Sequence, residues 1–81
     1  MDTHQDRINS LVQGILNLQQ NDTVTLTFIV IHMAFLFQEI KASDILSETF
    51  LPQIEVLCAL LERKTQKTFE TIFRELDTMY S

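Results

Sequence analysis

The segment TVTLTFIVIHMAFLF, residues 23–37, consists mainly of apolar side chains and contains no Asp, Glu, Lys or Arg. At its start, apolar residues alternate with threonines as far as Phe28, which is typical of a β-strand. Beyond Phe28 the alternation ends, and no second segment has a strand pattern with which a lone strand could pair its backbone groups. The segment therefore predicts a helix over about residues 23–41.

A membrane span is an alternative interpretation of this segment. A spanning helix needs about 20 consecutive apolar residues. The continuous run from Phe28 to Phe37 is shorter and contains His32, and Glu39 and Lys41 follow it closely. We therefore expect no membrane span. Insertion of this run into a membrane surface is a further hypothesis, which flotation with liposomes would test.

Apolar residues three and four positions apart predict two further helices. The first covers about residues 3–19, and Asn21 and Asp22 after it are suitable N-caps for the apolar helix that follows. The last covers about residues 49–80, which contain no glycine. Pro52 falls in the expected first turn of this helix, where a missing N–H costs little. We expect the long helix to be continuous.

The whole chain has 81 residues with one glycine and one proline, so it supplies few turns. We predict a single all-α domain, residues 1–81, with three antiparallel helices of which the C-terminal one is the longest. A chain of this size buries about 60–65% of its unfolded surface and is marginally stable alone. We expect dimerisation to complete the fold as a helical bundle.

The expected second helix is apolar around nearly its whole circumference. Its polar residues Thr25, His32 and Glu39 are seven positions apart and form one narrow line. A helix of this kind has to be buried on nearly all sides, and two other helices cover about half of it. A second copy of the chain is expected to cover the rest. The residues predicted for this oligomer interface are Phe28, Ile31, Phe35 and Leu36.

A second apolar stripe lies near the C-terminus of the expected long helix, beyond the reach of the two shorter ones. Aromatic and methionine side chains of this kind are enriched in interface cores. The stripe is predicted to serve either dimerisation or the binding of another protein. Its residues are Phe69, Ile72, Phe73, Leu76, Met79 and Tyr80.

Side chains suited to catalysis or metal binding are few. The histidines, His4 and His32, and the one cysteine, Cys58, do not have the spacing of metal ligands. A single glycine also excludes a glycine-rich phosphate loop. We expect no enzymatic activity, no metal and no cofactor. Cys58 is interpreted as a small buried hydrophobic residue.

The charge balance disfavours nucleic acid as a partner. A formal net charge of −5 repels phosphate backbones. One basic cluster, Arg63, Lys64 and Lys67, nevertheless leaves an alternative function: a DNA-associated transcriptional regulator that uses the basic patch at residues 63–67. Salt-dependent binding to duplex DNA would distinguish this alternative.

The function that the sequence favours is a non-enzymatic protein–protein interaction protein, either an adaptor, a regulator or a chaperone. We expect it to act as a homodimer or higher oligomer and to bind another protein through an amphipathic helix. One cysteine and an N-terminal segment without a secretory signal pattern favour a cytoplasmic location.

Overall fold

The computed structural model describes residues 3–80, without the side chain of Tyr80. These residues form four helices and no strand: α1 Thr3–Leu16, α2 Thr23–Lys41, α3 Asp44–Thr65 and α4 Phe69–Tyr80. The predicted all-α class is therefore confirmed, as is the helix over residues 23–41. The strand interpretation of this segment is wrong.

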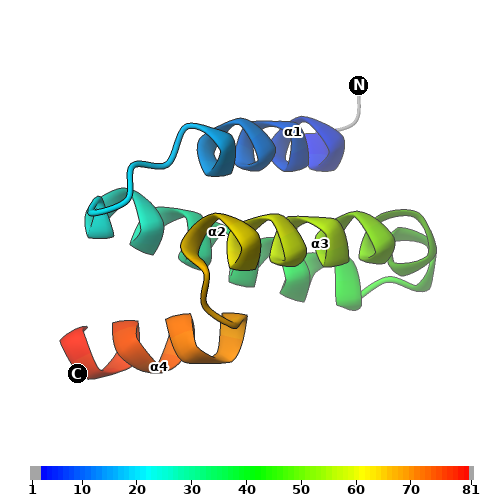
Figure 1. Cartoon of the computed structure of the whole chain (residues 1–81). Helices are drawn as coiled ribbons and strands as arrows, with labels where there is room; N and C mark the ends of the chain where they lie inside the picture. The colour runs from blue at the N-terminus through cyan, green and yellow to red at the C-terminus, as the bar shows by residue number, and fades with distance from the viewer. Residues whose placement is uncertain (1–2, 81) are drawn as a thin grey trace.

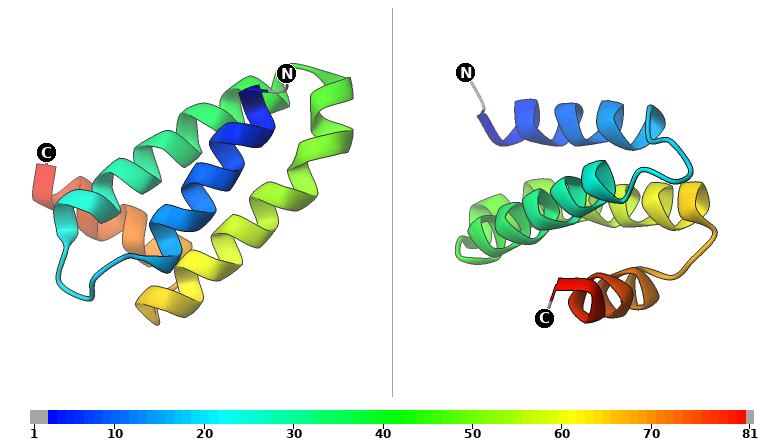
Figure 2. Two further views of the ribbon diagram at one scale, coloured as in Figure 1. Left: turned by 90° about the horizontal axis from the view of Figure 1, so that it is seen from above. Right: turned by 90° about the vertical axis from the view of Figure 1, so that its left-hand side faces the viewer.

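The helices are arranged in three layers. The antiparallel pair α2 and α3 forms the middle layer, with α1 on one side and α4 on the other (Figure 1; Figure 2, right). α1 packs against both middle helices, and α4 contacts α3. The core lies between the layers and receives side chains from all four helices. Its most deeply buried large residues are Ile15, Leu36, Ile40, Leu57, Leu61 and Ile72.

The predicted long helix over residues 49–80 is wrong, because the chain breaks it into α3 and α4. Gln66 follows α3 with a φ of 60° and a ψ of 30°, a left-handed conformation that ends many helices. The Oγ1 atom of Thr68 then accepts a hydrogen bond of 3.2 Å from the backbone N–H of Thr71, as an N-cap does. After the break, α4 lies beneath the middle layer (Figure 1).

Two other predicted helix ends also shift. α3 begins five residues earlier than residue 49, because Ser43 caps it and accepts a hydrogen bond from the backbone N–H of Leu46 at 3.4 Å. Pro52 consequently lies inside the helix rather than in its first turn. α1 ends at Leu16 rather than at residue 19, although Leu18 beyond it is still buried in the core.

Asp22 is the N-cap of α2, as its position in the sequence predicts. Its carboxylate accepts hydrogen bonds from the Thr25 hydroxyl at 2.5 Å and from the Thr25 backbone N–H at 3.0 Å. Both bonds favour the ionised acid, the hydroxyl more strongly, and they lower the pKa of Asp22 below its ordinary value. This cap stabilises the N-terminal end of α2, where the exposed face of the helix begins.

Candidate interaction site

One face of α2 is a continuous apolar surface that the rest of the described chain leaves about half exposed. Val24, Phe28, Ile31 and Phe35 are spaced four, three and four residues apart, and each is between 44% and 61% exposed. We call these four side chains the α2 ridge. They lie opposite the face of α2 that forms the core, which consists of Ile29, Val30, Met33, Leu36 and Ile40.

The ridge has the size of the largest apolar patch on a typical monomeric protein, and such patches are often functional. Single exposed apolar side chains are common, whereas contiguous patches of a few hundred Å² mark sites of interaction. Four adjacent side chains with these exposures present on the order of 400 Å² of apolar surface. The ridge therefore has the dimensions of an interface core.

The two sides of the ridge carry small or uncharged groups over most of its length. Thr27 and Ala34 flank one side, and Thr25 and His32 flank the other. The Nδ1 atom of His32 lies 2.7 Å from the carbonyl oxygen of Phe28, within the same helix. α2 itself places no formally charged side chain on the ridge between Val24 and Phe35, while Asp77 of α4 borders a hollow beside Val24, Phe28 and Ile31.

Only three of the four residues predicted for the oligomer interface lie on this surface. Phe28, Ile31 and Phe35 lie on the ridge, but Leu36 is fully buried in the core of its own chain and is not available to a second copy. Its inclusion is wrong because it faces the opposite side of α2. Val24 was missed by the sequence analysis, although its seven-residue spacing from Ile31 is a signal that could have found it.

The predicted C-terminal stripe is likewise divided between the core and the surface. Ile72 and Leu76 are buried in the chain itself, because the break before α4 turns them against the middle layer. The expectation that the stripe lies beyond the other helices is therefore wrong. Phe73 and Met79 are exposed, and Phe69 is half-buried with its ring 5.0 Å from that of Phe73. The side chain of Tyr80 lies outside the described part.

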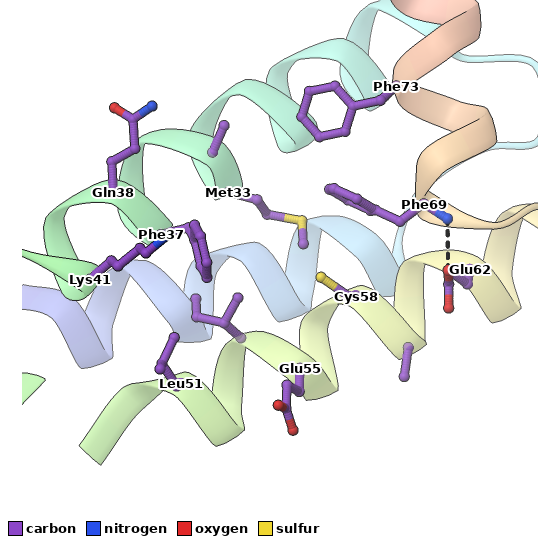
Figure 3. A pocket seen from close by; sticks show the side chains of 13 residues that line it. Met33, Phe37, Gln38, Lys41, Leu51, Glu55, Cys58, Glu62, Phe69 and Phe73 are labelled. Atoms are coloured by element: carbon purple, nitrogen blue, oxygen red, sulfur yellow. Dashed lines mark hydrogen bonds between the residues drawn. The ribbon is translucent and has the colours of Figure 1, made fainter. Parts of the chain in front are cut away.

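A second candidate surface is an apolar groove bounded by α2, α3 and α4, which we call the α2–α3 groove. Its volume is about 740 Å³. Figure 3 shows side chains from all three helices around it, with Phe69 and Phe73 of α4 at one end and Lys41 of α2 toward the other. The apolar residues that line it are Met33, Ala34, Phe37, Leu51, Ile54, Cys58, Ala59, Phe69 and Phe73.

The rim of the groove carries the charges. Lys41 lies on the α2 side, with its Nζ atom 5.8 Å from the centre of the Phe37 ring. Glu55 and Glu62 lie on the α3 side. The backbone N–H of Phe69 donates a hydrogen bond of 2.7 Å to Glu62, drawn as the dashed line in Figure 3. The groove thus has an apolar floor between a basic edge and an acidic edge.

A shallower hollow joins the ridge to α4. It has a volume of about 460 Å³, and Phe28 and Ile31 of the ridge face Phe73 and Leu76 of α4 across it. Phe73 also borders the α2–α3 groove. The two candidate surfaces are therefore neighbours, separated by one partly exposed aromatic ring.

The His, Cys, Asp and Glu side chains of the described chain do not cluster as metal ligands do. No group of three or more His, Cys, Asp and Glu residues in the described chain could hold a metal ion. Cys58 lines the groove, where its burial raises the pKa of the thiol, with smaller contributions from Glu62 and Glu55. A raised pKa keeps the thiol protonated and weakens it as a nucleophile. The arrangement suits binding.

The predicted basic patch is used partly within the chain. The Nζ atom of Lys64 donates a hydrogen bond of 3.0 Å to the carbonyl oxygen of Leu16. Lys67 forms an ion pair of 2.8 Å with Glu75. The ion pair offsets one positive charge of the patch, and the hydrogen bond holds the Lys64 ammonium group against its own chain. These contacts do not favour the DNA-associated alternative.

Among the described residues, one helix is long and apolar enough to cross a membrane. This is α2, which has 19 residues. Core helices of soluble proteins have the same length and composition, and α2 packs its core face against α1 and α3. The absence of a membrane span therefore stays a prediction.

Comparison of the chain with protein-family models, with curated proteins and with solved structures gives no match. The case for a function consequently depends on the two surfaces of the chain, the ridge and the groove.

Proposed function

We propose that the protein is a non-enzymatic protein–protein interaction protein, of the adaptor, regulator or chaperone type, which acts as a homodimer through the α2 ridge. The observation that carries the proposal is the position of the ridge. Four apolar side chains lie on the side of α2 that faces away from the core, where their exposure to water is unfavourable. A second copy of the chain offers an identical surface that would cover them.

The spacing of the ridge supports pairing with itself. Intervals of four, three and four residues are those of the apolar positions in a coiled coil, where side chains of two helices interdigitate. Closed two-fold pairing of identical surfaces is also the commonest form of homo-oligomer. The ridge extends over a little more than three helical turns.

An antiparallel pairing of the two α2 helices distributes side-chain volume evenly. It sets Val24 against Phe35 of the other chain, and Phe28 against Ile31 of the other chain. Each of the four layers then contains one phenylalanine and one smaller aliphatic residue. A parallel pairing would instead place like against like, with two layers of paired phenylalanines and a layer of two valines. Even filling of an interface core favours the antiparallel arrangement.

A charge on the ridge tests this proposal with a control on the same molecule. We expect the unmodified protein to be a dimer at micromolar concentration by sedimentation equilibrium. Phe35→Glu should make it a monomer while leaving the helical circular dichroism unchanged, because Phe35 is 60% exposed within one chain. Ile45→Glu changes a comparably exposed apolar residue away from the ridge and should leave the dimer intact.

Two results would refute dimerisation through the ridge. One is an unmodified protein that is monomeric at micromolar concentration. The other is a Phe35→Glu variant that associates as tightly as the Ile45→Glu control. Flotation of the unmodified protein with liposomes, abolished by Phe35→Glu, would assign the ridge to a membrane surface instead.

A further inference from the structure

The α2–α3 groove is continuous with a surface that already binds an amphipathic helix within this chain. α4 lies beneath part of the α2–α3 pair, where it buries Ile72 and Leu76 (Figure 1). The groove occupies the neighbouring part of the same face, and Phe69 and Phe73 of α4 close one of its ends (Figure 3). Part of the face is thus covered by a helix, and the neighbouring part is open.

We propose that this groove binds an amphipathic helix of a partner protein. The inference rests on the proposed function as an interaction protein, but it uses a different surface from the ridge. Along α3 the groove extends from Leu51 to Glu62, which corresponds to about 16 Å or three helical turns. A partner helix of about eleven residues fits this length, and α4 crosses the middle layer beside one end of it (Figure 3).

The floor of the groove defines the apolar face of the partner. Met33 and Cys58 present polarisable sulfur atoms, and Phe37 presents an aromatic ring. Met33 lies buried beneath the groove, and its flexible side chain can adjust to apolar side chains of different shapes above it. α4 covers the adjoining part of the face with side chains that begin at Phe69, at the end of the groove, and continue with Ile72 and Leu76, spaced three and four residues apart. The partner helix is expected to present Leu, Phe or Met with the same spacing.

The rim of the groove defines the charges of the partner. Lys41 stands on the α2 edge, and Glu55 stands on the α3 edge. A helix in the groove is complementary when it places an acidic residue toward α2 and a basic residue toward α3. Rim charges of this kind set orientation and specificity more than they set affinity. They also distinguish a protein helix from an uncharged apolar molecule of the same volume.

A display library of helical peptides provides the probe. Its members keep apolar residues at intervals of three and four and have randomised residues on both flanks. Selection against the full protein should enrich peptides with acidic residues on one flank and basic residues on the other, which bind at micromolar Kd. Ala59→Arg, on the exposed part of the groove, should weaken their binding by about tenfold or more. Ala42→Arg, an exposed alanine that does not line the groove, should leave binding unchanged.

Alkylation of Cys58 and sedimentation of the same samples complete the test. A bound peptide should slow the alkylation, because Cys58 lies in the groove. The proposal is overturned if no peptide is enriched, or if enriched peptides bind Ala59→Arg and the unmodified protein equally. It is also overturned if Ala59→Arg converts the dimer to a monomer, which would assign the groove to a second copy. Monomeric unmodified protein that still binds peptide would refute dimerisation alone, so the two proposals fail separately.

Discussion

The carboxylate of Glu62, on the last turns of α3, accepts a hydrogen bond of 2.7 Å from the backbone N–H of Phe69, the first residue of α4. The first N–H groups of a helix have no partner inside the helix, and its N-terminus carries a partial positive charge. The Glu62 carboxylate accepts a bond from one of these N–H groups, and its negative charge interacts favourably with the partial positive charge of the helix end. Glu62 therefore joins the two helices across their turn, at the end of the α2–α3 groove (Figure 3).

Removal of this bond should loosen α4. We expect Glu62→Ala to lower the free energy of unfolding by about 1 kcal/mol, the usual cost of losing a helix cap. Denaturation in urea measures the change. The matched control is Glu55→Ala, which removes the exposed acidic residue that precedes Glu62 on α3. It should have a smaller effect. Equal effects of the two variants would contradict the role of Glu62.

Glycine in place of Gln66 should stabilise the turn between α3 and α4. A non-glycine residue in the left-handed region costs about 1–2 kcal/mol, while glycine loses about 0.4–1 kcal/mol through the entropy of the unfolded chain. We therefore expect Gln66→Gly to raise the free energy of unfolding by up to about 1.5 kcal/mol. Arg63→Gly, inside α3, should lower it by a similar amount. A lower free energy of unfolding for Gln66→Gly would contradict the prediction, because it would mean that the left-handed conformation of Gln66 costs less than the added entropy of glycine in the unfolded chain.

The helices could be predicted where the sequence pattern of a single segment determines them, but the break between α3 and α4 could not. α1 and α2 follow from periodicity and caps within their own segments. The turn at Gln66 has no glycine to reveal it, and the apolar stripe of α3 resembles that of α4 closely enough to suggest one helix. The polar residues Thr65 and Thr68, which interrupt the stripe, were the available signal.

The ridge could be predicted only in part for a different reason. α2 is apolar on both sides, so its own sequence does not say which side faces the core. That choice depends on where α1 and α3 pack, and their packing places Leu36 inside and Phe35 outside. The groove depends on the position of α4, so it could not be predicted from an uninterrupted long helix.

Alanine in place of Gly14 should stabilise α1. Glycine within a helix costs about 1 kcal/mol relative to alanine. A Cβ atom at this position would lie 3.6 Å from the Cδ1 atom of Ile29, which is an ordinary contact between α1 and α2. We therefore expect Gly14→Ala to raise the melting temperature, as measured by circular dichroism, and Ser10→Ala on the exposed side of α1 to raise it less. A lower melting temperature for Gly14→Ala would show that the helices have to approach more closely.

The thiol of Cys58 should react slowly at neutral pH. Burial, followed by the charges of Glu62 and Glu55, raises its pKa above the ordinary value of 9.0. Because the thiolate is the reactive form, its population in the folded protein stays below that of an exposed thiol until the pH passes the raised pKa. Alkylation by iodoacetamide should therefore be slower in the folded protein than in urea, and the rate should climb at higher pH. Equal rates at neutral pH would contradict this prediction.

A distance between two copies distinguishes the antiparallel dimer from the parallel one. In the antiparallel pairing the two-fold axis passes between Ile29 and Val30, midway along the ridge. Ala42 lies about 19 Å from that axis along the helix, so labels on the two copies would be about 37 Å apart. A parallel pairing would place them about 10 Å apart, the distance between the helix axes. Ala42→Cys with a nitroxide label, combined with Cys58→Ala, allows a pulsed electron paramagnetic resonance measurement at an exposed position seven residues beyond Phe35, past the end of the ridge. A distribution centred near the longer distance is expected. A distribution near the shorter one would reject the antiparallel register while leaving the ridge as the dimer interface, because both arrangements bury the same four side chains.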